Sequence, residues 1–368
     1  MEKEKTYRIM VSGGGTGGHI YPAISIAQAL KDMLQSVEIL FVGAKGKMEM
    51  EKVPAAGFEI EGLWISGIQR KITAGNLMFP FKLCSSIITS YKLLKKFKPD
   101  VVIGVGGYAS GPLLYAATRK GIPTLIQEQN SYAGLTNKWL AKKVNTICVA
   151  YEGMEKYFPK EKLVVTGNPV RKTIQLNPNR KSEAYKYFDL DSSKPILLVI
   201  GGSLGARTLN ESILSGLEEL KKEGVQLIWQ CGGFYHEEMK ARVEGKGGVV
   251  LLHDFIYQMD FAYSIANVVI SRAGALSIAE LMLTGKPSIL VPSPNVAEDH
   301  QTINAKTLVK RDAAELVSDK EAMDKLVRQA IELINDKKRQ DELSENIESM
   351  ARENAAVDIA NEVMKLVS

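Results

Sequence analysis

Two stretches of this chain share one pattern, in which an apolar run, a glycine-rich turn and a helical pattern follow one another. Residues 7–11 are apolar enough for a buried strand, and Gly13–His19 then reads Gly-Gly-Gly-Thr-Gly-Gly-His. The second copy begins at residues 196–200 and continues through Gly201–Arg207. A glycine-rich turn from a strand into a helix brings backbone N–H groups and a helix N-terminus close to a ligand. The pattern therefore predicts two α/β domains that each open on a ligand-binding turn.

Apolar runs alternate with helical stretches along nearly the whole chain, which is typical of α/β domains with parallel sheets. Strands are expected at residues 7–11, 38–42, 101–105, 124–127, 146–149 and 163–166, and then at 196–200, 226–230, 249–252, 268–271 and 288–291. Turn-forming and polar residues at 167–171 and 177–182 separate the two series. Two doubly wound domains facing one another would form a cleft at the carboxyl ends of their strands, where ligands bind in such folds.

Length and composition limit the class of protein. At 368 residues the chain is long for one hydrophobic core, which also favours two domains. The first residues are charged and no stretch approaches about 18 uninterrupted apolar residues, so we expect neither a secretory signal nor a membrane-spanning helix. Three widely separated cysteines suit a reducing cytoplasm, and neither they nor the four histidines have metal-ligand spacing. We therefore expect no metal and no other cofactor.

Charge is distributed unevenly. Residues 1–170 hold 22 Lys and Arg against 13 Asp and Glu, a net charge of +9, whereas the remainder carries −4. Between Trp64 and Asp100, apolar side chains are mixed with seven basic residues and no acidic one. Such a mixture is suited to the surface of an anionic membrane. The expected contact residues are Leu77, Met78, Phe79, Phe81, Arg70, Lys71 and Lys82. The alternative is an ordinary helix packed on the sheet, above all from Ile87 to Phe97.

The first glycine loop formally fits the dinucleotide pattern G-x-G-x-x-G at Gly13, Gly15 and Gly18. A dinucleotide site also needs an acidic residue at the end of the next strand, where it holds the ribose. Residues 38–42 are followed by Gly43-Ala44-Lys45, so we expect no carboxylate there and no dinucleotide. His19 follows the loop at a helix start, which favours a neutral imidazole able to accept a proton. Its role is catalytic or substrate-positioning, or else purely structural.

Other turns after predicted strands are candidates for the same ligand. Gly104–Pro112 suits a phosphate or a sugar, or only close packing of a helix on the sheet. Gln127–Asn130 offers amides and a carboxylate to sugar hydroxyls, or is an ordinary polar turn. Gly201–Ser203 resembles a phosphate cradle, although no G-K-[ST] of a P-loop follows.

The segment Ser271–Glu280 is the most specific one in the second half. A buried strand ends, and a helix is expected to begin near Ser277 with its N-terminus facing a diphosphate. Glu280, expected in the first turn, would hold a ribose or only balance the helix dipole. Further on, Gln301 and Asn304 would share one helix face and contact sugar hydroxyls.

Seven motifs occur in order along the chain, at residues 14–19, 106–108, 128–130, 167–171, 201–206, 271–276 and 300–305. With them the chain closely resembles the MurG family of peptidoglycan glycosyltransferases over essentially its whole length. The resemblance implies a GT-B glycosyltransferase fold. It also implies an inverting, metal-independent transfer of GlcNAc from UDP-GlcNAc to the C4 hydroxyl of the MurNAc in undecaprenyl-pyrophosphoryl-MurNAc-pentapeptide. Lipid I would become lipid II in this way for cell-wall synthesis.

The resemblance implies partners, a location and domain limits as well. The enzyme would lie peripherally on the anionic inner leaflet, at the cytoplasmic side of the cell membrane, together with cell-wall or division proteins and without nucleic acid. Residues 1–168 and 348–368 would form the acceptor and membrane-facing domain, because the family's last helix crosses back. Residues 169–347 would form the UDP-GlcNAc-binding domain.

The resemblance also implies roles for single residues. His19 would be the catalytic base, with Glu128 as a second candidate. Within the donor site, Ile256 would place its backbone against the uracil and Glu280 would hold the ribose hydroxyls. The complete set of donor contacts would be Thr16, Gly17, Gly18, Asn130, Arg171, Ser203, Ile256, Ala275, Leu276, Ser277, Ile278, Ala279, Glu280 and Gln301.

One departure from the family pattern is visible, because the family usually has His before Glu-Gln-Asn and this chain has Gln127. An imidazole would be missing beside the acceptor site, which places more weight on His19 or Glu128. Three alternative functions stay open at this point. They are a UDP-GlcNAc 2-epimerase, a glycolipid synthase with a diacylglycerol acceptor, and a non-catalytic nucleotide-sugar-binding protein.

Overall fold

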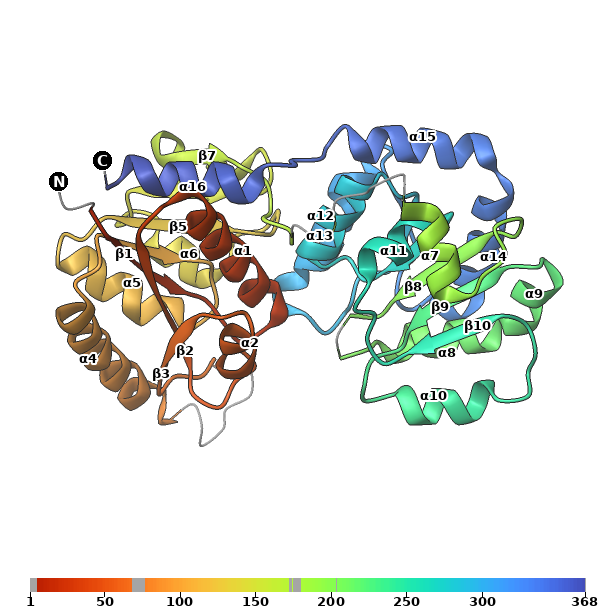
Figure 1. Cartoon of the computed structure of the whole chain (residues 1–368), viewed down its shortest axis with the longest axis horizontal. Helices are drawn as coiled ribbons and strands as arrows, with labels where there is room; N and C mark the ends of the chain where they lie inside the picture. Colours follow the sequence, from red (N-terminus) through yellow and green to blue (C-terminus); the bar gives the residue numbers. More distant parts are fainter. Residues whose placement is uncertain (1–4, 68–76, 172–173, 175–179, 203, 368) are drawn as a thin grey trace. The chain divides into compact units, whose positions relative to one another are not determined.

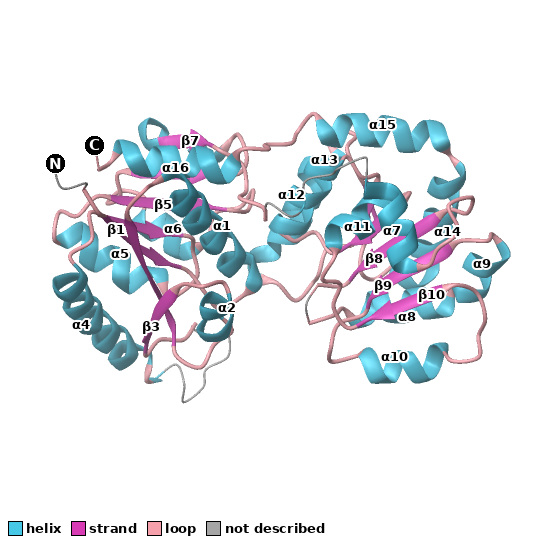
Figure 2. Cartoon of the chain, viewed as in Figure 1, coloured by secondary structure: helices cyan, strands magenta, loops and turns pink. Residues whose placement is uncertain are grey.

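The computed structural model describes residues 5–67, 77–171, 174, 180–202 and 204–367, and the chain divides into two compact units (Figure 1). Unit 1 comprises Met1–Arg171 and Asn354–Ser368, and unit 2 comprises Lys172–Glu353. Each unit is built on one parallel sheet with helices packed on it, as the colouring of Figure 2 makes visible. The predicted α/β fold with parallel sheets is therefore confirmed.

The sheet of unit 1 has seven strands among the described residues, in the order β3-β2-β1-β4-β5-β6-β7, and all its pairings are parallel. From β1 the sheet first grows on one side, to β2 and β3, and then on the other side, from β4 to β7. The switch between the two sides lies between β1 and β4, which is where doubly wound domains bind ligands. The strands are β1 (Tyr7–Ser12), β2 (Val37–Ala44), β3 (Glu59–Leu63), β4 (Val101–Gly104), β5 (Thr124–Glu128), β6 (Thr146–Val149) and β7 (Leu163–Val165).

Helices cover both faces of this sheet. Helices α4 (Phe79–Phe97), α5 (Ser110–Arg119) and α6 (Leu135–Leu140) bury apolar side chains against one face. Helices α1 (Gly17–Met33), α2 (Glu49–Ala55) and α16 (Ala355–Lys365) contribute to a second cluster on the other face. Two short 3-10 helices, Met154–Lys156 and Lys160–Lys162, precede β7. Because both faces are covered, the strands are continuous apolar runs, which is why the sequence predicted them well.

The sheet of unit 2 has six strands among the described residues, in the order β10-β9-β8-β11-β12-β13, again all parallel. This is the same order as in unit 1, so the reversal of chain direction lies between β8 and β11. The strands are β8 (Ile196–Ile200), β9 (Gln226–Gln230), β10 (Val250–His253), β11 (Val268–Ser271), β12 (Ser288–Leu290) and β13 (Glu315–Leu316).

Some of the helices of unit 2 pack on its sheet in a core that includes the fully buried Trp229. The Trp229 indole N–H donates to Oδ1 of Asn210, at 3.1 Å, so its polar atom is satisfied inside the core. The helices are α7 (Lys181–Phe188), α8 (Arg207–Ser215), α9 (Leu217–Lys222), α10 (His236–Val243), α11 (Met259–Ile265), α12 (Ala275–Thr284), α13 (His300–Val309), α14 (Ala322–Asn335) and α15 (Lys337–Glu348), with a 3-10 turn at Ala297–Asp299.

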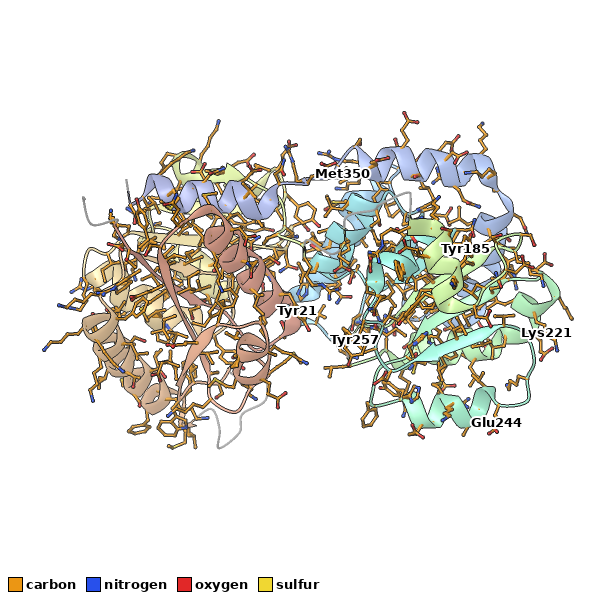
Figure 3. The ribbon with its side chains drawn as sticks, viewed as in Figure 1. Tyr21, Tyr185, Lys221, Glu244, Tyr257 and Met350 are labelled. Carbon is orange, nitrogen blue, oxygen red and sulfur yellow. The ribbon has the colours of Figure 1, made fainter. Side chains whose placement is uncertain are left out.

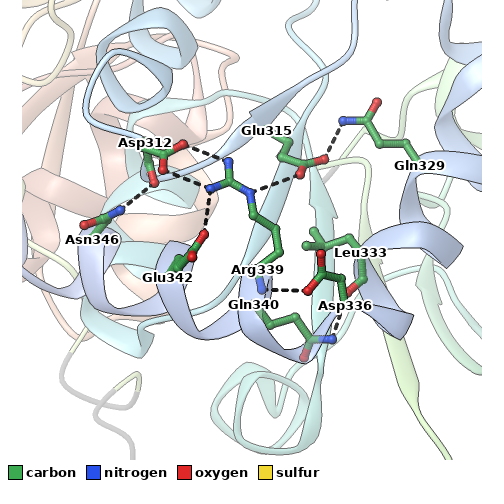
Figure 4. A network of polar contacts seen from close by, with 9 residues as sticks. All are labelled: Asp312, Glu315, Gln329, Leu333, Asp336, Arg339, Gln340, Glu342 and Asn346. Atoms are coloured by element: carbon green, nitrogen blue, oxygen red, sulfur yellow. Dashed lines mark hydrogen bonds and ion pairs between the residues drawn. The ribbon is translucent and has the colours of Figure 1, made fainter.

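Helix α15 belongs to unit 2 because polar contacts anchor it there (Figure 4). The Arg339 guanidinium donates to both carboxylate oxygens of Asp312, at 2.8 and 2.9 Å, and lies 3.6 Å from a Glu315 oxygen. The Asp336 carboxylate accepts the backbone N–H of Arg339 and so caps the helix. The unit boundary therefore falls after Glu353, a few residues beyond the expected change at 347–348.

Helix α16 returns to unit 1, where Ile359, Ala360 and Val363 are fully buried in the same cluster as α1.

The sequence analysis did not predict two of the strands. At one edge of its sheet β3 carries the exposed Glu59 and Glu61, and β13 has only two residues at the edge of the other sheet. Within the described residues, no helix combines the length and the apolar character that crossing a membrane requires.

Candidate active site

The glycine loop between β1 and α1 is packed backbone to backbone against the second glycine patch. Gly15 has φ +89° and Gly107 has φ +79°, a region that favours glycine. A Cβ added at Gly107 would lie 2.3 Å from the Gly14 carbonyl oxygen. Gly106 and Gly107 therefore serve close packing of the two loops, which brings both to the carboxyl ends of β1 and β4.

His19 lies in the first turn of α1, close to this contact. Its Nδ1 is 3.3 Å from the Thr16 hydroxyl oxygen, which can donate or accept and so can support either tautomer. A Cβ added at Gly106 would lie 3.1 Å from His19 Nε2 and would crowd the ring, and the φ of +88° at Gly106 also favours glycine. The two loops together thus fix where the imidazole lies.

Glu128 ends β5 and is almost completely buried, with 2% exposure. Its carboxylate accepts the backbone N–H groups of Asn130, at 3.1 Å, and Gly134, at 2.9 Å, and Nδ2 of Asn137, at 2.9 Å. Burial raises the pKa of Glu128, and these hydrogen bonds oppose the rise. Both carboxylate oxygens are engaged in shaping the loop that carries Asn130, whose side-chain amide also donates to Glu128.

Gln127, whose amide the sequence analysis offered to sugar hydroxyls, lies instead in the interior. Its side chain is fully buried, and its amide N–H donates to Asn168 Oδ1 at 3.1 Å. Gln129 donates to the Gln127 side-chain oxygen, and Asn168 donates to the Gln129 carbonyl at 2.9 Å. The three amides satisfy one another, so a glutamine fits this position as part of a buried network.

Arg171, the last residue of this part of unit 1, lies beside the start of α1. Its guanidinium carbon is 5.7 Å from the ring centroid of Tyr21, which Figure 3 labels. A Cβ added at Gly17 would lie 3.3 Å from the same ring. The expected residues Thr16, Gly17, Gly18, His19 and Arg171 are thus gathered at one end of α1.

A carboxylate does lie at the end of β2, which corrects the sequence analysis. Glu49 of α2 is fully buried, and its Oε1 accepts the Ala44 backbone N–H at 3.0 Å. Its Oε2 accepts the Gly15 backbone N–H at 3.1 Å. Sequence reasoning missed Glu49 because it follows the strand by five residues. The argument against a dinucleotide still holds, since both oxygens face the protein backbone.

In unit 2, the segment after β11 contains most of the expected donor contacts. Helix α12 begins at Ala275, two residues before the expected start near Ser277. Glu280 therefore lies in the second turn of the helix, whereas the sequence analysis expected it in the first. The Tyr263 hydroxyl donates to Glu280 Oε2 at 3.0 Å. Tyr263, fully buried on α11, therefore orients the carboxylate that the resemblance assigns to the ribose.

Arg272 stabilises the carboxyl edge of this sheet. Its guanidinium donates to Asp319 Oδ1, at 2.5 Å, and to the Val291 carbonyl, at 3.0 Å. Asp319 also accepts from the Thr208 hydroxyl of α8 at 3.0 Å. These contacts join the ends of β11 and β12 to the segment after β13.

Two expected contacts have protein partners of their own. The Ile256 backbone N–H donates to Gln230 Oε1 at 3.0 Å, so sequence reasoning missed Gln230 as the residue that holds this loop. The Gln301 side-chain oxygen accepts the Ser293 backbone N–H at 2.8 Å. Asn304, in contrast, is fully buried and donates to the Ala273 carbonyl at 3.3 Å, so it supports the loop before α12 and does not face a sugar.

The described residues of the predicted membrane contact lie at the start of α4 and directly before it. Leu77 and Phe81 are 74% and 66% exposed, whereas Phe79 is partly buried against the core of unit 1. Lys82 Nζ lies 6.0 Å from the ring centroid of the half-exposed Trp64.

Three predicted site residues lie outside the described residues, namely Arg70, Lys71 and Ser203. Among the described side chains, no group of three or more His, Cys, Asp and Glu is arranged to hold a metal ion.

Known protein families match both units. The model of the glycosyltransferase family 28 N-terminal domain matches residues 9–149, and that of the C-terminal domain of the same family matches residues 196–363. Together they cover most of the chain, and they define a glycosyltransferase with a GT-B fold.

Similar proteins narrow the family further. The chain is 55% identical to the UDP-N-acetylglucosamine–N-acetylmuramyl-(pentapeptide) pyrophosphoryl-undecaprenol N-acetylglucosamine transferase of Cytophaga hutchinsonii, over 100% of this chain and 99% of that one. It is 52% identical to the protein of the same name from Flavobacterium psychrophilum, over 98% of both. The crystal structure of Acinetobacter baumannii MurG matches with a TM-score of 0.78 and 28% identity, over 98% of this chain and 99% of that chain. The chain therefore belongs to the MurG family, as its motifs predicted.

A UDP-GlcNAc 2-epimerase from Neisseria meningitidis also shares the fold. Its structure, bound to UDP-GlcNAc, matches with a TM-score of 0.67 but only 16% identity, over 97% of this chain and 100% of that chain. This likeness concerns the fold alone.

Proposed function

We propose that this protein transfers GlcNAc from UDP-GlcNAc to lipid I and forms lipid II. The observation that carries the proposal is the 55% identity, over the full length of the chain, to a transferase named for this reaction. The C4 hydroxyl oxygen of MurNAc would attack the anomeric carbon of GlcNAc from the face opposite the diphosphate. The bond from that carbon to the diphosphate oxygen breaks, UDP leaves with the electron pair, and the configuration is inverted.

The donor contacts proposed for unit 2 are supported by the geometry after β11. Ala275 to Ile278 form the first turn of α12, and a helix N-terminus stabilises the negative charge that develops on a leaving diphosphate. Glu280, oriented by Tyr263, would accept the ribose hydroxyls. Ala279, Gln301, Ser203 and the backbone of Ile256 complete the proposed contacts in this unit.

On unit 1, we propose that His19 accepts the proton of the attacking hydroxyl. The Thr16 hydroxyl and the Gly106 backbone position its ring, which is the support that a general base requires. Thr16, Gly17, Gly18, Asn130 and Arg171 would contact the donor. For Glu128 the four hydrogen bonds that it accepts favour a positioning role, in which it shapes the loop of Asn130.

We further propose that the face of unit 1 formed by α4, α5 and α6 contacts the anionic cytoplasmic leaflet of the membrane. Leu77, Met78 and Phe81 are exposed there with Lys82 nearby, while Phe79 anchors α4 to the core. Trp139 of α6 is exposed as well, and Lys143 Nζ lies 4.3 Å from its ring centroid. Apolar and aromatic side chains with cations beside them suit the headgroup region.

One assay separates this function from its alternatives. The purified protein is incubated with radiolabelled UDP-GlcNAc and a short-chain lipid I analogue, and the products are separated. A labelled disaccharide-lipid is expected, and its yield is expected to persist with excess chelator. Parallel incubations cover the alternatives. UDP-ManNAc formed without acceptor would indicate a 2-epimerase, and a labelled glycosyl-diacylglycerol formed with diacylglycerol as the acceptor would indicate a glycolipid synthase. Binding of UDP-GlcNAc without any product would indicate a nucleotide-sugar-binding protein.

The role of His19 has its own test in the same assay. His19→Ala is expected to lower kcat at least a hundredfold, the size of a typical general-base contribution. UDP affinity should stay within twofold, because the main UDP contacts are proposed for unit 2. Unchanged turnover would remove His19 as the base.

A further inference from the structure

Glu49 has no role in the reaction outlined above, yet it is a fully buried carboxylate beside the glycine loop. Burying a charged group costs free energy unless hydrogen bonds compensate it. Here the two oxygens accept the backbone N–H groups of Gly15, at 3.1 Å, and Ala44, at 3.0 Å. The side chain therefore ties the end of β2 to the turn that leads into α1.

The space around Glu49 is fitted to this contact. A Cβ added at Gly14 would lie 2.2 Å from Glu49 Oε1, and one added at Gly43 would lie 2.6 Å from Glu49 Cγ. These two positions therefore accommodate Glu49 only as glycine, at the present place of the side chain. Gly14 and Gly43 therefore leave the space that the Glu49 carboxylate occupies.

Tyr108 holds the loop in a second contact. A Cβ added at Gly15 would lie 2.9 Å from Tyr108 Cε1. Burial raises the pKa of the Tyr108 hydroxyl, and the nearby negative charge of Glu49 raises it further. Gly15, with φ +89°, is thus held by the hydrogen bond that its backbone N–H donates to Glu49 and by the nearby aromatic ring of Tyr108.

We propose that Glu49 is a positioning residue that holds the glycine loop, and through it Thr16 and His19, in the geometry needed for transfer to the acceptor. Gly15 directly precedes Thr16, whose hydroxyl lies 3.3 Å from His19 Nδ1. A shift of the Gly15 peptide therefore displaces the imidazole support. In dinucleotide-binding domains an acidic residue at the end of the second strand binds the ribose. In this protein a carboxylate at that place binds the loop instead.

The inference rests on the proposed function, so the test begins with the wild-type protein and the lipid I analogue. Glu49→Ala is expected to lower kcat at least tenfold, while the Kd for UDP, measured by calorimetry, changes less than twofold. Glu49→Gln, which keeps the volume but places an amide N–H against a backbone N–H, should have the same effect if Glu49→Ala folds poorly. Val53→Ala is the matched control, because Val53 is buried on the same helix and belongs to the apolar cluster of α1 and α16. It should lower the melting temperature and leave kcat within twofold.

A double-mutant cycle tests the contact itself. Gly14→Ala should lower kcat strongly in the wild type, since its methyl group displaces the carboxylate, and much less in the Glu49→Ala background. Additive effects would overturn the inference, as would wild-type kcat in both Glu49 variants.

A measurement that needs no turnover separates the positioning role of Glu49 from the proposed transferase function. The His19 ring resonances, assigned among the four histidines with His19→Gln, should move in Glu49→Gln and not in Val53→Ala. Should the wild type form no disaccharide, the proposed function fails and the His19 spectra still decide the role of Glu49. Unmoved His19 resonances with an active wild type refute the positioning role alone.

Discussion

Replacing Tyr263 by phenylalanine is expected to weaken UDP-GlcNAc binding without slowing the chemical step. The substitution removes one hydroxyl, which donates to Glu280 Oε2 at 3.0 Å from a fully buried ring. Hydrogen bonds to charged groups contribute about 1.5–3 kcal/mol. Glu280 is only partly buried, so water replaces some of this interaction in the variant.

We expect the variant to lose about 1 kcal/mol of the free energy of UDP-GlcNAc binding. This is the cost of ordering the Glu280 carboxylate, without the tyrosine hydroxyl, when the ribose binds. This corresponds to a rise of about fivefold in KM, given that about 1.4 kcal/mol is a factor of ten. The value of kcat should stay within twofold, since the ribose lies away from the bond that breaks.

Initial rates with the lipid I analogue, at varied UDP-GlcNAc, provide the measurement. Tyr185→Phe is the matched control, because it removes a tyrosine hydroxyl from α7 of the same unit (Figure 3). Its KM should equal that of the wild type. If Glu280→Ala raises KM and Tyr263→Phe does not, orientation by the tyrosine is refuted.

Two further predictions concern the membrane and pH. Leu77→Asp combined with Phe81→Asp should reduce partitioning onto anionic vesicles at least tenfold, since burying each side chain is worth about 1.5–3 kcal/mol. Val357→Asp on α16, an exposed apolar position on the other face of unit 1, should leave partitioning unchanged, and equal losses would refute the proposed surface. Burial lowers the pKa of Lys286 to about 8, so the folded protein releases this proton while the unfolded chain retains it up to about pH 10.4. The free energy of unfolding of the wild type should therefore rise relative to that of Lys286→Met by about 2 kcal/mol between pH 7 and 9.5. Urea unfolding at several pH values measures it, and the same pH dependence in both proteins would contradict the prediction.

Much of the fold could be predicted because buried parallel strands are continuous apolar runs. The runs at 196–200 and 226–230 coincide with β8 and β9. β3 was missed because its charged residues at an edge lack that signal, and β13 because two residues carry no period. The start of α12 was placed two residues late, since small residues such as Ala275 fit a turn as well as a helix.

The candidate site was predicted only as far as its motifs. Residues such as His19 and Glu280 could be named because they belong to short segments with a fixed order. Their supports could not be named, because Glu49 lies 34 residues from Gly15 and Tyr263 lies 17 residues from Glu280. No local pattern links such pairs.

The sequence by itself therefore determined two doubly wound α/β domains, the family and the segments that line each sheet edge. Local apolar periodicity and glycine-rich turns carry that information along the chain. Only the tertiary structure decided that Gln127 is buried, that Glu128 and Glu49 shape loops, and that Tyr263 orients Glu280. The physical reason is that a buried polar group must find its partner in space, and the parallel order of the strands brings together residues that are distant in the chain.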